Sequence, residues 1–216
     1  MSREECFNKG IHSLGEEVVL AYISGVDVTY GGIPMVSVGS GMAAIESVIP
    51  SVNWVLVDPD PTSFPHECKE NGMEPFMKPH FPYVKDLVAS RPDIVGNCCL
   101  FLNWCDPNYS DYDSEAVELL KPKGIISIVE KFMKSNGAAG GLGFHRILDN
   151  AERRDGDYTV MAMTKLVPHP DSARVMDIRI VWLDRKGGFM NQPMIVLPEF
   201  VQSKIPSSAQ ENCSVM

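Results

Sequence analysis

Apolar positions along the chain follow two patterns that alternate with each other. In the first, consecutive apolar and β-branched residues predict buried strands. Such runs occur at 34–39, 53–58, 97–104 and 124–132. In the second, apolar residues spaced three and four positions apart predict helices. These occur at 14–25, 41–48, 83–90, 114–120 and 144–154. Buried strands that alternate with helices predict a parallel sheet with helices on both faces.

The last third of the chain has a different pattern. Residues 158–166 and 175–183 predict two long strands, and the segment between them predicts an antiparallel hairpin. Residues 193–197 predict one more strand. From Glu199 onward the chain is polar, which predicts a disordered tail. We therefore expect one domain over residues 1–198 and a tail over 199–216.

Charge and composition narrow the classes of function. The chain has 216 residues, a net charge of -9, 44% hydrophobic residues and 22% charged residues. Its longest basic cluster is Arg153-Arg154, so nucleic acid is a poor candidate partner. No spanning-length apolar run and no signal-peptide core occur, which predicts a cytoplasmic protein. The six cysteines lack zinc-ligand spacing, so we expect reduced thiols and no metal site.

A glycine turn follows the first predicted strand and opens the next helix. Gly39 and Gly41 flank Ser40 there, and their missing side chains let a ligand approach the backbone closely. Asp58 lies 19 residues after Gly39, at the end of the second strand. A carboxylate there can accept hydrogen bonds from both hydroxyls of a ribose. The pattern predicts a nucleotide-type ligand, and "GSGMAA" leaves a nicotinamide dinucleotide open.

Three segments together resemble the class I S-adenosylmethionine-dependent methyltransferases, over about 14–183. They are "VSVGSGMAAIE", "VLVDPDP" and "LLKPKGIISIVE". The resemblance implies a three-layer Rossmann-like α/β sandwich, with a mostly parallel seven-stranded sheet and an antiparallel C-terminal hairpin. It implies S-adenosylmethionine as cofactor. Gly39, Ser40 and Gly41 would then lie against its methionine part. Asp58 would hold the ribose, and Pro59 with the adjacent acid at position 60 would lie near the adenine.

One position departs from the pattern of that family. The family commonly has an acid two residues before the first glycine, where this chain has Ser37. Glu46, one turn into the predicted helix, either compensates for the missing acid or is a surface residue. We expect it at the surface.

The loop after the strand at 97–104 is where the resemblance places substrate contacts. Methyl transfer needs a nucleophile held in line and sometimes a base that removes its proton. Asp106 is the candidate base, and Asn103 would orient an amine or a hydroxyl. Trp104 and Tyr109 would form a wall that faces the cation. The alternative is a loop stabilised by these residues without chemistry.

Two further residues are weaker candidates. Glu130 ends the strand at 124–132 and would contact the substrate or form a salt bridge. His145 would be a base only if residues 135–143 fold over the cleft as a lid. A lone histidine on a helix is more often structural, and we expect that role.

The last four residues, "CSVM", fit the pattern for prenylation. Methionine at the end favours a farnesyl group on Cys213. One isoprenoid gives marginal membrane binding, and the tail has a single lysine. We therefore expect reversible association with a cytosolic membrane face.

The leading hypothesis is a methyltransferase that acts on a small molecule or a protein. Two alternatives stay open: a non-catalytic binding or scaffold module with the same fold, and an NAD(P)-dependent oxidoreductase. The sequence does not identify the methyl acceptor or the oligomeric state.

Overall fold

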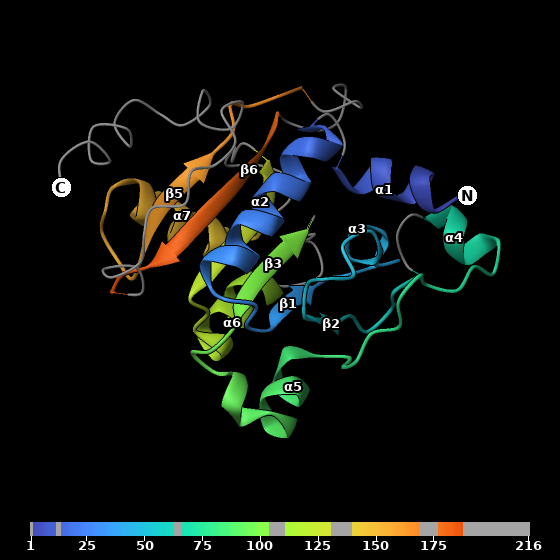
Figure 1. Ribbon diagram of the computed structural model, residues 1–216, viewed down its shortest axis with the longest axis horizontal. Helices are drawn as coiled ribbons and strands as arrows, with labels where there is room; N and C mark the ends of the chain where they lie inside the picture. The colour runs from blue at the N-terminus through green and yellow to red at the C-terminus, as the bar shows by residue number, and fades with distance from the viewer. Residues whose placement is uncertain are drawn as a thin grey trace.

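The computed structural model describes residues 2–11, 14–62, 66–103, 111–130, 140–168 and 177–187. Figure 1 shows a central twisted sheet with helices in front of it and behind it. Within the described ranges, no helix is both long enough and apolar enough to cross a membrane.

The sheet has six strands in the described part of the chain, in the order β2-β1-β3-β4-β6-β5. The strands are β1 (Met35–Val38), β2 (Trp54–Val57), β3 (Cys99–Asn103), β4 (Gly124–Glu130), β5 (Tyr158–Met163) and β6 (Ile178–Arg185). The first four run parallel, and β6 runs antiparallel to both β4 and β5. This confirms a mostly parallel sheet with an antiparallel hairpin at its end. The predicted strand at 193–197 lies outside the described residues, so a seven-stranded sheet stays a prediction.

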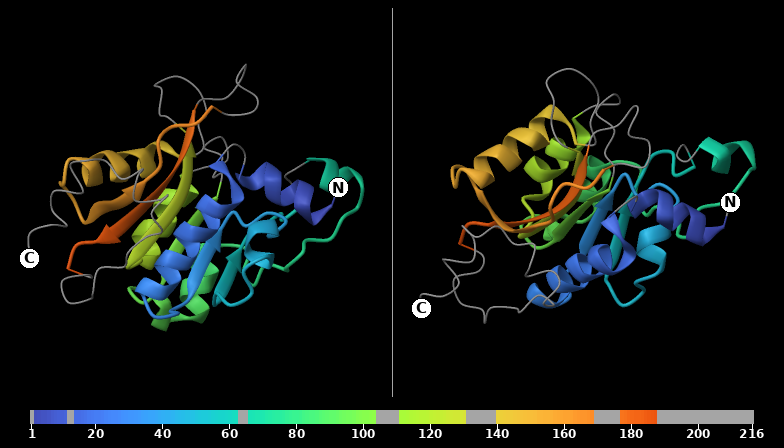
Figure 2. Two further views of the ribbon diagram at one scale, coloured as in Figure 1. Left: turned by 45° about the horizontal axis from the view of Figure 1, so that its top comes forward. Right: turned by 90° about the horizontal axis from the view of Figure 1, so that it is seen from above.

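Helices cover both faces of the sheet. They are α1 (Arg3–Ile11), α2 (Glu16–Thr29), α3 (Ala44–Ser47), α4 (His66–Glu70), α5 (Val84–Ser90), α6 (Tyr112–Leu120) and α7 (Leu142–Glu152), with a 3-10 turn at Pro92–Ile94. Figure 2 shows α1, α2 and α3 on one side of the sheet, and α6 and α7 on the other. Each face buries its own apolar core, and apolar residues of α5 belong to the α6–α7 side.

Side chains of each buried strand alternate between these two cores. Cys99 and Phe101 join the core under α1 and α2, while Cys98 and Leu100 join the core under α6 and α7. The adjacent Cys98 and Cys99 side chains therefore point to opposite faces of the sheet. The four cysteines within the described residues, Cys6, Cys68, Cys98 and Cys99, are buried free thiols.

Several helix boundaries differ from the predictions. The first predicted helix continues past Gly25 to Thr29, because Val26 buries its side chain completely and a helical glycine costs only about 1 kcal/mol. The helix predicted at 41–48 is a single turn of four residues, since Gly41 and Ala43 both have positive φ. Residues 59–80 contain α4, where the sequence pattern predicted no helix, and α1 was not predicted either.

Candidate functional site

A cavity of about 630 Å³ lies at the carboxyl ends of β1 and β2, between α5 and α6. Its wall comes from the ends of these two strands, the start of α5, the first turns of α6 and one residue of α4. These residues are Val38, Gly39, Val57, Asp58, Pro59, Asp60, Lys69, Pro82, Tyr83, Val84, Lys85, Tyr112 and Glu115. Ligands of open α/β sheets occupy this position, and the volume suits a small-molecule ligand.

Gly39 is required at its position for two reasons. Its φ is +70°, a conformation that side chains with a Cβ rarely adopt. A Cβ added there would also lie 3.3 Å from the Tyr112 hydroxyl oxygen. The Gly39 N–H donates to the Val57 carbonyl at 3.0 Å, which ties the turn to the neighbouring strand. The bare turn therefore packs against Tyr112, and both residues face the cavity. The sequence pattern gave no signal for this contact.

Asp58 combines a place on the cavity wall with two backbone hydrogen bonds. Its Oδ2 accepts the Gly41 N–H at 2.8 Å, and its Oδ1 accepts the Asp60 N–H at 2.8 Å. Burial raises the pKa of Asp58, and the two backbone donors oppose that shift. Each carboxylate oxygen has a second lone pair, so the group can still accept hydroxyl donors from a ligand.

Among the residues close to Asp58 in the sequence or in the glycine turn, some line the cavity and others do not. Pro59 lines the cavity, and Asp60 forms an ion pair with Lys69 of α4 at 2.9 Å. That lysine also lowers the pKa of Asp60. Both partners are exposed, so the pair adds little stability. Ser40 is buried and, like Gly41, does not lie on the cavity wall.

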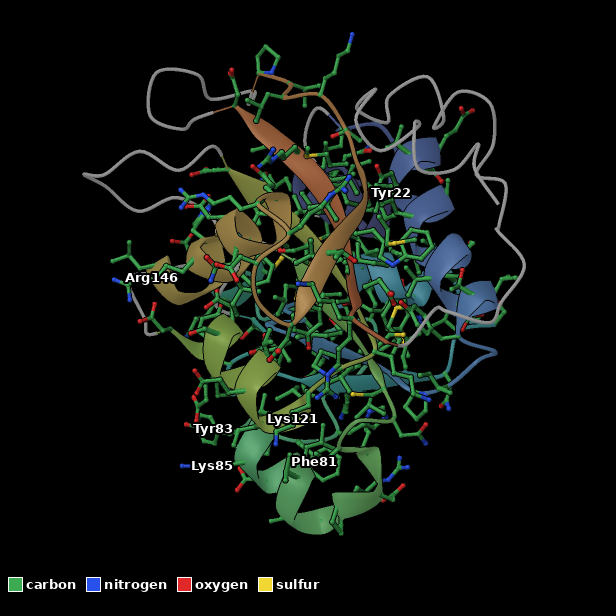
Figure 3. All side chains as sticks on the ribbon, turned by 90° about the vertical axis from the view of Figure 1, so that its left-hand side faces the viewer. Tyr22, Phe81, Tyr83, Lys85, Lys121 and Arg146 are labelled. Carbon is green, nitrogen blue, oxygen red and sulfur yellow. The ribbon has the colours of Figure 1, made fainter. Side chains whose placement is uncertain are left out.

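The start of α5 closes the cavity on the side of β2. Phe81 pairs with Val57 through an isolated parallel bridge, which places the following residues beside the end of β2. Tyr83 is half exposed, and the Lys85 Nζ lies 5.1 Å from the centre of its ring. Figure 3 shows Phe81, Tyr83 and Lys85 together at this end of the molecule. The cavity thus has an aromatic ring at its rim.

Glu46 is not a surface residue, and that expectation was wrong. Its side chain is 1% exposed, and its Oε1 accepts the Ser37 O–H at 2.5 Å. The left-handed Ala43 precedes the single turn of α3 and turns Glu46 toward the sheet. The pKa of Glu46 is raised to about 7, chiefly by burial and in smaller part by the negative charge of Asp58, while hydrogen bonds from the Ser37 hydroxyl and from the backbone oppose the shift.

Asn103 ends β3 and lies under α1. A Cβ at Gly10 would lie 3.4 Å from the Asn103 amide nitrogen. The Asn103 Oδ1 is buried and finds no hydrogen-bond partner among the described residues, and the same holds for the Ser40 Oγ. The register pairs Val38 with Leu102, so these two unpartnered oxygens follow neighbouring strand ends. The other loop candidates, Trp104, Asp106 and Tyr109, lie outside the described residues, as does Cys213.

Neither of the two weaker candidates lines the cavity. Glu130 is buried at the end of β4 and is not part of the cavity wall. His145 is buried on α7, where its Nε2 would lie 3.2 Å from a Cβ at Gly140. His145 therefore packs against the segment that leads into its own helix. No group of three His, Cys, Asp or Glu side chains in the described part of the chain is arranged to hold a metal ion.

The sequence matches no protein-family model and no curated protein. Solved structures with a similar fold include a SAM-dependent methyltransferase from Anabaena variabilis ATCC 29413, with a TM-score of 0.49 and 10% identity over 78% of this chain and 84% of that one. An O-methyltransferase from Bacillus cereus in complex with SAH gives 0.47 and 10%, over 85% and 90%. The O-methyltransferase TomG from Streptomyces achromogenes, in complex with SAM, gives 0.46 and 14%, over 80% and 82%. At such identities and TM-scores, these likenesses do not establish a function. The function must therefore be inferred from this chain's own residues.

Proposed function

We propose that this chain is an S-adenosylmethionine-dependent methyltransferase that acts on a small molecule or a protein. One observation carries the proposal. The cavity at the carboxyl ends of β1 and β2 is lined by both the side-chain-free Gly39 and the Asp58 carboxylate. Bare backbone and an acceptor acid in one space suit an adenosyl compound better than a simple anion.

The residues present fit the adenosyl part of this cofactor. Asp58 would accept the ribose hydroxyls with its remaining lone pairs. Pro59 and the ring of Tyr83 offer apolar surface for the adenine, beside the β2 end of the cavity. The unpartnered Ser40 and Asn103 oxygens leave hydrogen-bonding capacity near the glycine turn. When bound, the cofactor would supply a methyl group on a sulfonium, which is electrophilic without help from the protein.

The role of the protein in such a reaction is to hold the acceptor in line and to remove its proton. Asn103 would orient the acceptor through its amide, and Asp106 would take the proton as general base. Trp104 and Tyr109 would shield the cation, and Glu130 would contact the acceptor. These roles are proposals. The choice of a small molecule or a protein, and not a nucleic acid, as the methyl acceptor is a proposal as well.

Isothermal titration calorimetry with S-adenosylmethionine and S-adenosylhomocysteine tests the proposal. Asp58→Asn should lower the binding affinity for both ligands about tenfold or more, because a hydrogen bond to a charged acceptor contributes about 1.5–3 kcal/mol. The matched control is Asp93→Asn, an exposed residue of the 3-10 turn. No binding of either ligand at millimolar concentration refutes the proposal.

The same preparation separates the alternative functions. Titration with NADH, followed by its fluorescence, should give no saturable change if the cavity takes an adenosyl amino acid. Saturable NADH binding in place of S-adenosylhomocysteine binding would support the oxidoreductase. Binding of S-adenosylhomocysteine without methyl transfer to any of a broad panel of amines, hydroxyls and thiols would support the non-catalytic module.

We further propose that Cys213 is farnesylated and gives reversible association with a cytosolic membrane face. The support is the "CSVM" sequence at 213–216. A thioether would form between the cysteine sulfur and the farnesyl carbon, with loss of the thiol proton and of diphosphate. Purified farnesyltransferase with labelled farnesyl diphosphate should label the full chain and should not label Cys213→Ser. Equal labelling of both, or of neither, contradicts the proposal.

A further inference from the structure

Two cysteine thiols that are 62 positions apart in the chain meet between α1 and α4. The Cys6 and Cys68 Sγ atoms lie 3.8 Å apart, and both side chains are buried in the core under α1 and α2. Figures 1 and 2 show the start of α1 beside α4. Neither thiol is part of the cavity wall, so the proposed function gives this contact no role.

The two sulfur atoms are close enough for a disulfide bond to form with little rearrangement. A disulfide joins its sulfur atoms at about 2.05 Å, so the Cys6 and Cys68 Sγ atoms must approach each other by about 1.8 Å. Rotation about the Cα–Cβ bond of either residue, together with a small shift of the five-residue helix α4, can supply that movement. By contrast, the adjacent Cys98 and Cys99 side chains belong to the cores on opposite faces of the sheet.

The packing of α4 decides when these thiols can react. Among the α4 residues whose burial is described, Cys68 is buried, whereas Lys69 and Glu70 are exposed. The ion pair of Lys69 with Asp60 is exposed too and adds little stability. An element with so few buried contacts separates from the rest of a protein at a low cost in free energy. While α4 stays packed, burial and the neighbouring Cys68 raise the pKa of Cys6 to about 11, so the Cys6 thiol is protonated and unreactive.

A bond between the two cysteines would join the cavity wall to α1. Lys69, the next residue after Cys68, lines the cavity. α1 is itself packed closely against α3, since a Cβ added at Gly10 would lie 3.3 Å from the Cδ1 of Ile45. A disulfide between Cys6 and Cys68 would therefore restrict the movement of α4 relative to α1 and keep Lys69 on the cavity wall.

We propose that Cys6 and Cys68 form a reversible disulfide by exchange with a low-molecular-weight disulfide such as oxidised glutathione, and that this bond holds α4 against α1. When α4 opens, the Cys68 thiolate attacks one sulfur of glutathione disulfide and releases one glutathione. The Cys6 thiolate then attacks the Cys68 sulfur of the mixed disulfide and releases the second glutathione. The two cysteine sulfurs are oxidised, glutathione disulfide is reduced, and the two cysteine protons go to the two released thiols. This inference does not rest on the proposed function.

Disulfide mapping of the full chain tests the proposal. The folded wild-type protein is incubated with glutathione disulfide, its remaining thiols are alkylated, and its disulfide bonds are located by mass spectrometry. A bond between Cys6 and Cys68 should be the main product, and dithiothreitol should reverse it. Cys6→Ala should stop at a glutathione adduct on Cys68. Cys98→Ala is the matched control and should keep the bond, because Cys98 belongs to the core on the other face of the sheet.

Three results of this mapping would overturn the proposal. They are glutathione adducts without the Cys6–Cys68 bond, bonds made mainly by other cysteines, and a Cys6–Cys68 bond that forms only in urea. The mapping of the wild-type protein decides among them, so the result does not depend on whether a variant folds.

Trypsin measures whether the bond holds α4 in place. Trypsin cleaves after lysine and Lys69 lies on α4, so cleavage of the folded protein there reports the opening of α4. The oxidised wild-type protein should be cleaved after Lys69 about tenfold or more slowly than the reduced protein. The same oxidation should not slow the cleavage of Cys6→Ala, which cannot form the bond. Equal cleavage rates for oxidised and reduced wild-type protein would show that the bond does not restrain α4, and the proposal would fail.

Discussion

Replacing Glu46 by glutamine should stabilise the ligand-free protein at pH 8 far more than at pH 5. Glutamine has nearly the same shape and can still accept the Ser37 hydrogen bond, but it carries no charge. Burial raises the pKa of Glu46 from 4.5 to about 7, so the folded state binds this proton more tightly than the unfolded state. Stability from this group is therefore fully present below pH 4.5 and is lost as the pH rises through 7.

The magnitude follows from the same two pKa values. Each pH unit between them corresponds to about 1.4 kcal/mol, so ionised Glu46 costs the folded state about 3 kcal/mol at pH 8. At pH 5 most of this cost is absent. The stabilisation by Glu46→Gln should thus be about 2–3 kcal/mol larger at pH 8, or about 5–10 °C in Tm for a chain of this size.

Urea unfolding of both proteins at pH 5 and pH 8, without ligand, measures this difference. The control is Glu118→Gln, the same substitution at an exposed residue of α6. A Glu46→Gln effect that is the same at pH 5 and pH 8 would refute the reasoning. It would mean that Glu46 is either solvated or already paired with a cation in the ligand-free protein.

Two glycine substitutions test the packing around the site and under the sheet. Gly39→Ala should lower the free energy of unfolding by about 1–2 kcal/mol and should lower the affinity for S-adenosylhomocysteine. The φ of Gly39 is +70°, and the new methyl group would lie 3.3 Å from Tyr112. A free energy of unfolding in urea and a calorimetric affinity that both equal those of the wild type would contradict this prediction. Gly124→Ala should cost about 1–3 kcal/mol or more, because a Cβ there would lie 2.5 Å from the Tyr30 ring. A loss below about 0.5 kcal/mol in urea unfolding would show that the ring moves aside freely.

The sequence by itself determined the layered architecture. Runs of consecutive apolar residues marked β1 to β4 to within three residues at either end, because a strand buried on both faces is mostly apolar. The hairpin of β5 and β6 followed from two long strands with a short polar connection. The cavity wall at Gly39 and Asp58 was also predictable, since the carboxyl ends of adjacent parallel strands meet at one edge.

Only the tertiary structure decided which side chains surround the glycine turn at 39–41. Glu46 was expected at the surface because a helical period was assumed, whereas two positive-φ residues shorten α3 and turn its acid inward. Asn103 lies under Gly10, and Tyr112 packs on Gly39, through contacts between residues far apart in the chain. A local pattern reports which face of an element is apolar. It does not report which element covers the end of a strand, because that depends on long-range packing that has no period in the sequence.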